Sequence, residues 1–182
     1  MIADKDPTDA RQDLFRYLAD VRSHYATYHN HKEATTWAAT GVYLLLALQF
    51  ASALPKYTPV SCAGKGTLSA VIILVTSLFL TYLYRQFMVT RKAAGYVGAC
   101  FQLGARLLSD PSYMPSSEEL APATGDAPSP PIQSRTSLPR ILISTSDVLT
   151  NRALPNRRKL EALAYLLIVI GCSALLAHLW IF

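Results

Sequence analysis

The sequence predicts an all-α membrane protein with three transmembrane helices, the first two of which form a long helical hairpin that extends into the cytoplasm. Three observations favour this fold class: apolar stretches of membrane length, few charged residues, and an uneven distribution of basic residues. The apolar stretches are residues 34–54, 67–84 and 160–182. Each is close to the roughly 20 residues that cross a hydrocarbon core of about 30 Å, and a single segment satisfies its own backbone polar groups in lipid only as a helix.

Charged residues make up 16% of the 182 residues, whereas they are about 25% of a typical soluble domain. We therefore expect lipid-facing helices and one compact unit, without a separate soluble catalytic domain. The chain also lacks the G-x-S-x-G, H-E-x-x-H and Walker-A patterns of common enzymes. We expect neither catalysis nor a bound cofactor.

The basic residues predict the orientation of the chain. Five of the 17 lysines and arginines precede the first apolar stretch, two lie between the first and the second, and ten lie between the second and the third. The positive-inside rule then places residues 1–33 and the connection 85–159 in the cytoplasm, and the loop 55–66 and the C-terminus outside. Because topology accounts for the net charge of +5, nucleic acid is not an expected partner. Residues 1–33 contain no apolar run, so the first stretch is expected to act as its own insertion signal in the plasma or inner membrane.

The first helix is predicted to run from Asp9 to Leu54, a length of about 69 Å. Pro7 followed by Thr8 and Asp9 is typical of a helix start. Apolar or aromatic residues recur at a 4-3-4-3 spacing that is typical of a face packed on another helix: Leu14, Leu18, Val21, Tyr25 and Tyr28. The same register continues, without a break, through Lys32, Thr35, Ala39, Val42 and Leu46.

The second helix is predicted to begin near Thr67, after a loop at 55–66 that contains Pro55 and Pro59, and to continue past its span as a cytoplasmic extension at 85–109. This extension is rich in small residues, which let helix backbones approach closely. We expect residues 86–108 to dock on the first helix. The predicted contacts are made by Tyr25, Tyr28, Gly95, Gly98 and Phe101.

The connection 110–159 is proline-rich and is predicted to be mostly irregular. A proline-rich ligand for a partner's groove is the functional alternative. Residues 138–154 recover some hydrophobicity and predict either a short helix on the inner membrane surface or a short strand through 141–144. Arg157, Arg158 and Lys159 mark the inner boundary of the third span, and Trp180 is expected at the outer interface.

A dense group of polar and aromatic residues lies where the first helix is predicted to enter the membrane. His29, His31 and Trp37 are expected to anchor the helix at headgroup level. A metal site is not expected, because His24 and His31 lie two turns apart, about 10.5 Å along the axis. The three cysteines, Cys62, Cys100 and Cys172, are predicted in different compartments, so we expect no disulfide within the chain.

A polar track is predicted along the first span, through Glu33, Thr36, Thr40 and Gln49. These side chains either line a pore in an oligomer or form hydrogen bonds between helices. Gln49 is the most polar of them within the span and is expected to face protein or water.

The stretch Tyr25–Trp37 reads Y-x-x-Y-H-x-H-K-E-x-x-x-W, and the small-residue helix Ala93–Ala105 follows the second span. Over residues 9–108 this layout resembles the two-span SLATT-type domains of bacterial conflict and defence systems. The resemblance implies a membrane-perturbing or pore-forming effector. The third span and the proline-rich connection lie outside it.

Two functions therefore remain open. The first is an oligomer-forming membrane protein that opens a pore or perturbs the bilayer, with lipid, further copies of itself and a cytoplasmic protein as partners. The alternative is a non-catalytic accessory or scaffold subunit of a larger membrane complex.

Overall fold

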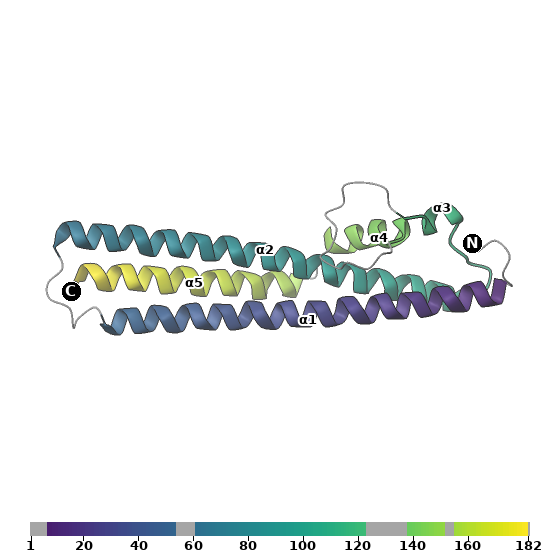
Figure 1. The fold of residues 1–182 in the computed structure, drawn as a ribbon, viewed down its shortest axis with the longest axis horizontal. Helices are drawn as coiled ribbons and strands as arrows, with labels where there is room; N and C mark the ends of the chain where they lie inside the picture. The colour runs from purple at the N-terminus through teal and green to yellow at the C-terminus, as the bar shows by residue number, and fades with distance from the viewer. Residues whose placement is uncertain (1–6, 54–60, 123–137, 152–154, 182) are drawn as a thin grey trace. The chain divides into compact units, whose positions relative to one another are not determined.

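The computed structural model describes residues 7–53, 61–122, 138–151 and 155–181, and these residues form an all-α structure (Figure 1). The helices are α1 (Pro7–Ala53), α2 (Cys62–Ser109), α3 (Ser117–Leu120), α4 (Arg140–Asn151) and α5 (Pro155–Ile181). Helices α1, α2 and α5 are long and apolar enough to cross a membrane. The predicted fold class is therefore confirmed.

The contacts divide the chain into two units, which are described separately. The span unit comprises His31–Thr90 and Leu154–Phe182. The extension unit comprises Met1–Asn30 and Arg91–Ala153. Helices α1 and α2 each contribute residues to both units.

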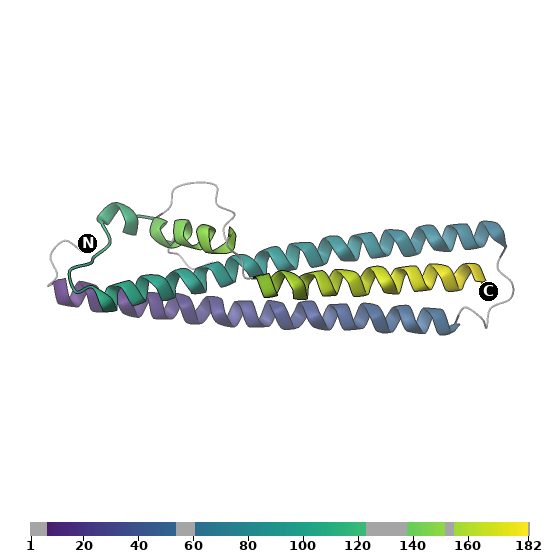
Figure 2. The ribbon, with the colours of Figure 1, turned by 180° about the vertical axis from the view of Figure 1, so that it is seen from behind.

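In the span unit, α1, α2 and α5 run side by side, as both views of the ribbon show (Figures 1 and 2). Leu83 of α2 and Ala164 and Ile168 of α5 are fully buried and form one core cluster, against which Trp37 of α1 packs. A second cluster joins the same helices through Ile72, Leu175 and Leu179. Interlocking side chains along the three helices therefore hold the span unit together.

The outer surface of the span unit is apolar. About half or more of the surface of many large aliphatic side chains is exposed on the single chain, among them Val42, Leu45, Leu46, Leu48, Ile73, Leu74, Leu78, Leu166, Val169 and Ile170. Soluble monomers rarely expose contiguous apolar patches larger than a few hundred Å², whereas lipid-facing helices do so as a rule. The structure thus has the surface that a bilayer would cover.

The core of the extension unit is built from α1, α2 and α4. Leu18 of α1, Ala99, Leu103 and Leu107 of α2, and Leu142 of α4 are all buried in one cluster. The ring of Tyr25, which is 4% exposed, lies 4.7 Å from the ring of Tyr96 between their centroids. The predicted packing of the first helix on the second is confirmed in this unit.

Helix α2 ends in this unit at Ser109, where a side chain of α1 pairs with carbonyl groups just beyond the helix. The Arg11 guanidinium donates hydrogen bonds to the backbone oxygens of Asp110, at 3.1 Å, and Pro111. The Arg106 guanidinium lies 4.1 Å above the Tyr113 ring. Both contacts fix the chain as it leaves α2, because each joins a cation to a group that follows the helix.

The glycines of α2 have a different partner from the one predicted. A Cβ on Gly95 would meet Thr150 and would lie 2.9 Å from the carbonyl oxygen of Ser146, and a Cβ on Gly98 would lie 3.0 Å from Leu149. These contacts all belong to α4, so the prediction that both glycines accommodate tyrosines of the first helix is wrong. Gly104 does face α1, with its nearest contact at Phe15.

Two element boundaries differ from expectation, and the choice between helix and strand at residues 140–151 is decided. Residues 62–66 belong to α2, not to the loop, because Ser61 caps the helix: its hydroxyl accepts a hydrogen bond from the Gly64 amide at 3.2 Å. Residues 140–151 form the helix α4 and not the alternative strand. Helix α5 begins at Pro155, five residues before the predicted third span.

Helix α4 makes the described part of the connection more helical than predicted. Its buried residues, Leu142 and Ser146, face the core of the extension unit. The helix therefore packs its apolar side on protein, which corrects the expectation that this side lies on the membrane. Residues 123–137 and 152–154 of the connection lie outside the described residues.

The buried face of α1 does not keep the predicted register. Leu18 and Tyr25 are buried as the 4-3 spacing predicts, but further along the buried positions are Thr36 and Thr40, while Val42 is 55% exposed. From Leu18 to Thr36 the chain advances about five turns at 3.6 residues per turn. A heptad repeat follows 3.5 residues per turn and drifts by about 20° per heptad on a straight helix. The predicted unbroken seam is therefore wrong beyond Tyr28.

Replacing Gly95 by alanine is expected to loosen α4 and to cost about 1–3 kcal/mol of stability, because the new methyl group overlaps the Ser146 carbonyl. Gly104→Ala is the matched control. Its methyl group would lie 3.8 Å from the Phe15 ring, an ordinary contact, and alanine favours the helix by up to about 1 kcal/mol. Amide hydrogen exchange in residues 140–151 measures the effect. Equal protection of α4 in both variants would contradict the assigned contact.

Candidate functional site

The polar side chains of the first span face in two directions. Thr36 and Thr40 are 1% and 2% exposed, and their hydroxyls donate to carbonyl oxygens one turn earlier, those of Lys32 at 2.7 Å and Thr36 at 2.9 Å. Gln49 is exposed, and Glu33 is half-buried. The structure therefore does not bring the predicted polar track together on one face, and the two buried threonines are satisfied by their own helix.

A pair of hydroxyl groups joins α1 to α2 within the span unit. The Tyr43 and Thr76 oxygens lie 2.7 Å apart, and the Thr76 hydroxyl also lies 2.7 Å from the carbonyl oxygen of Ile72. Since Thr76 donates to that carbonyl, it accepts from the Tyr43 hydroxyl. The Tyr43 ring stacks on Phe79 with the centroids 4.8 Å apart. The sequence left open whether polar side chains of the first span line a pore or form hydrogen bonds between helices. This contact is a hydrogen bond of the second kind, made by residues next to the predicted track.

The predicted interface anchors occupy several environments. The His29 ring lies 3.3 Å from the side-chain oxygen of Asn30, His31 is exposed, and Trp37 packs against the buried core. The Trp180 indole donates to the Ser69 hydroxyl at 3.1 Å and is 54% exposed. Lys159 is exposed. Arg157 and Arg158 lie in α5, and their side chains are outside the described part of the structure.

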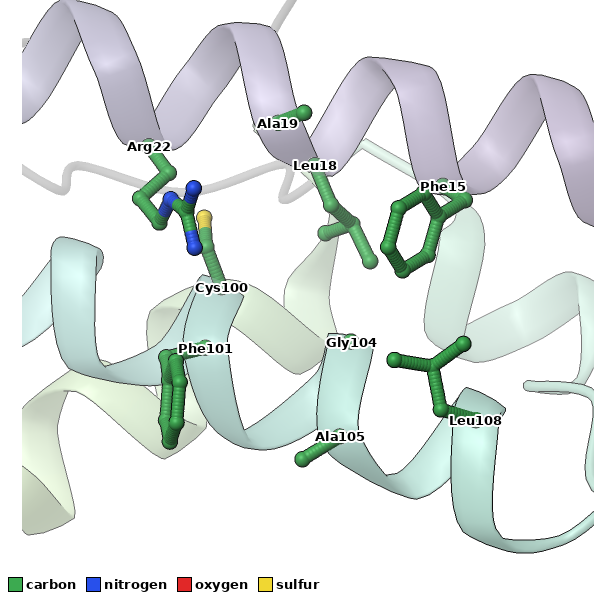
Figure 3. Close-up of a pocket in the computed structure, with 9 residues that line it drawn as sticks. All are labelled: Phe15, Leu18, Ala19, Arg22, Cys100, Phe101, Gly104, Ala105 and Leu108. Atoms are coloured by element: carbon green, nitrogen blue, oxygen red, sulfur yellow. The ribbon is translucent and has the colours of Figure 1, made fainter.

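The predicted contacts of the extension helices are partly realised. Tyr25 is buried, Tyr28 is half-buried, and Gly95 and Gly98 lie under α4. Phe101 is 63% exposed, so the prediction that it packs between the helices is wrong. It lines a groove between α1 and α2 together with Arg22 and the thiol of Cys100 (Figure 3).

Burial changes the chemistry of the Cys100 thiol, which lies outside the apolar spans. Cys100 is 3% exposed, and desolvation raises the pKa of its thiol to about 11, although the nearby Arg22 guanidinium acts in the opposite direction. A thiol with a raised pKa is a poor nucleophile and a poor metal ligand at neutral pH. Among the described residues, no three His, Cys, Asp or Glu side chains gather closely enough to hold a metal ion.

Sequence reasoning missed several buried polar residues, among them Glu161, Thr90 and Ser146. Glu161, at the start of the third apolar stretch, is only 5% exposed, and Thr90 is 3% exposed. Thr90 donates to the carbonyl oxygen of Gln86 at 2.6 Å. The predicted boundary at Lys159 and Leu160 placed Glu161 at the edge of the membrane. The spacing could have predicted its burial, because Glu161 lies three and seven residues before Ala164 and Ile168 and therefore shares their helix face.

No family model, curated protein or solved structure matches this chain.

Removing the hydroxyl of Tyr43 and removing that of Thr76 are expected to destabilise the protein by different amounts. Tyr43→Phe is expected to cost about 0.5–1.5 kcal/mol, because it removes a hydrogen bond but leaves Thr76 donating to its own helix. Thr76→Val is expected to cost about 1–3 kcal/mol, because the tyrosine hydroxyl then has no acceptor. Reversible unfolding in mixed micelles measures both. Ser77→Ala is the control, since the Ser77 hydroxyl bonds only to its own helix, at the carbonyl of Ile73. Equal costs for the two variants would contradict the assigned donor.

The Cys100 thiol is expected to react slowly with iodoacetamide in the folded protein. At pH 8 a thiol of pKa about 11 is roughly one part in 1,000 thiolate, whereas the ordinary pKa of 9.0 gives about one part in 10. The raised pKa alone thus predicts alkylation about 100-fold slower in the folded than in the denatured chain. Peptide mass spectrometry gives both rates for Cys100. Similar rates in the two states would show that the thiol is not buried.

Proposed function

We propose that this protein is an oligomer-forming integral membrane protein that opens a pore or otherwise perturbs the bilayer when its copies associate. The observation that carries the proposal is the exposure of Gln49 on the outer surface of the span unit. In the described part of the chain, no hydrogen bond joins its side-chain amide to another residue.

An exposed amide in an apolar span needs a partner, because an unpaired polar group in hydrocarbon costs several kcal/mol. The exposed Ser77 and Thr81 hydroxyls avoid this cost by donating to carbonyl oxygens of their own helix, at 2.8 and 2.9 Å. Gln49 has no such bond. A second copy of the chain, or water held between copies, supplies the partner that the described residues do not provide.

The surroundings of Gln49 favour a contact between helices. Val42, Leu45 and Leu46 lie within two turns of Gln49 and are 55%, 62% and 60% exposed. A single amide within an apolar helix face is typical of association in membranes, where hydrogen bonds between helices contribute about 0.6–2 kcal/mol each. Thr36 and Thr40 are not available to such a contact, because they are buried within their own chain.

The membrane-perturbing output rests on the resemblance of residues 9–108 to SLATT-type effector domains, and a role in bacterial defence belongs to the same proposal. The distribution of basic residues supports a plasma or inner membrane location with the N-terminus in the cytoplasm and the C-terminus outside.

The experiment compares wild type with Gln49→Leu in lipid nanodiscs and liposomes. Loss of the amide is expected to weaken self-association by about 3- to 30-fold, the equivalent of about 0.6–2 kcal/mol per contact. Native mass spectrometry with retained lipids gives the subunit number, and release of a trapped ion-sensitive dye gives the flux. Thr81→Val is the control, because Thr81 is also exposed but is satisfied within its own helix.

Three outcomes decide between the candidate functions. Oligomers that release dye, with both properties reduced in Gln49→Leu but not in Thr81→Val, support the proposal. An oligomer that never conducts overturns the pore but leaves the association. A monomer that co-purifies with a stoichiometric membrane partner overturns the proposal in favour of an accessory or scaffold subunit.

A further inference from the structure

Helices α1 and α2 leave a groove of about 240 Å³ between them in the extension unit (Figure 3). Its walls include Phe15, Phe101 and Leu108, which are 41%, 63% and 72% exposed although they lie outside the apolar spans. Gly104 and Ala105 add little side-chain bulk between these larger residues. Helix α4 contributes no residue to the groove, which is open on the single chain.

Among the described residues that line this apolar groove, Arg22 is the charged one. Arg22 lies at the same end as Cys100, while Phe15 and Leu108 lie at the other end (Figure 3). None of the described residues that line the groove is acidic. Within the described residues, the Arg22 guanidinium has no hydrogen bond and no carboxylate partner.

The size of the groove suits one short hydrocarbon chain. Phe15 and Arg22 are seven residues apart on α1, about 10.5 Å along the helix axis. Water in the apolar part would find few of the two to four polar partners that ordered water needs.

We propose that this groove binds a medium-chain fatty-acid anion, with its hydrocarbon chain between Phe15, Phe101 and Leu108 and its carboxylate on Arg22. A guanidinium binds a carboxylate through two parallel hydrogen bonds, which makes the pair both strong and directional. The walls bury the chain and the arginine supplies the complementary charge. The occupant therefore has to be anionic at one end and apolar along the rest.

Charge argues against a symmetric contact in which the grooves of two copies face each other. A two-fold contact places the same surface of both copies together, so it would add a second Arg22 and no acidic residue from the groove. Like charges in such a contact disfavour it. The proposal is independent of the pore, because it rests on residues of the extension unit alone.

The test uses the full-length protein in nanodiscs of zwitterionic lipid, with a photoactivatable decanoate as the probe. Cross-linked peptides are identified by mass spectrometry, and unlabelled decanoate competes for the site. We expect saturable labelling of the segments around residues 15–22 and 100–108. Bound decanoate is also expected to slow alkylation of Cys100, because the thiol lies at the carboxylate end of the groove.

Two variants and two controls separate charge from shape. Arg22→Gln is expected to weaken decanoate binding by about tenfold or more, because it removes a charge-assisted hydrogen bond. Ala105→Phe is expected to abolish labelling by filling the groove. Arg16→Gln, a neutralised arginine of the same helix outside the groove, should bind as wild type. Decanol, with the same chain and no charge, should compete poorly.

The result that supports the proposal is saturable labelling that Arg22→Gln weakens, Ala105→Phe abolishes and decanol does not block. Labelling that decanol blocks as well as decanoate does, or that survives both substitutions, overturns it. Cross-links between two copies of the chain through these segments also overturn it, in favour of a protein interface. Amide exchange in residues 140–151 provides the folding check, since α4 should stay protected in every variant.

Discussion

The backbone of a helix in lipid has no water to bind, so its N–H and C=O groups must pair within the helix itself. This constraint governs the span unit. The hydroxyls of Thr36, Thr40 and Thr76 return to carbonyl oxygens of their own helices, which keeps polar groups away from the hydrocarbon. Packing then joins the helices, because side chains such as Leu83 and Ile168 meet in buried clusters while a wide aliphatic surface remains outside.

The extension unit works under a different constraint, since it is built largely from segments with ordinary polar sequence. Its small residues permit close approach of a third helix: Gly95 and Gly98 lie under α4, and Ala99 is fully buried in the core. Covering that side of α2 leaves the groove beside Phe101 open. The same stretch of helix thus offers one occupied face and one unoccupied face, with different chemistry available to each.

Two polar side chains, Gln49 and Arg22, have no hydrogen-bonding partner among the described residues. Gln49 is an amide on an apolar surface, and its physical need is a hydrogen-bonding partner from outside the chain. Arg22 is an exposed cation at the end of an apolar groove, and the proposed occupant is an anion that carries its own hydrocarbon chain. The amide of Gln49 binds another polar group, whereas the guanidinium of Arg22 binds an anion. The first therefore leads to association of copies and the second to a small ligand.

The sequence by itself determined the helical class, the three apolar helices and the start of α1, because segment length, composition and breaker residues such as Pro7 act locally. It also located the buried positions Leu18 and Tyr25, where a few turns suffice to reveal a face. Only the tertiary structure decided which neighbour covers Gly95, that Phe101 is exposed, and that Thr36 is buried while Gln49 lies on the outer surface. A small residue permits another helix to approach closely, but it does not determine which helix does so. A small error in the assumed helical period grows with distance along the helix until a residue is assigned to the wrong face.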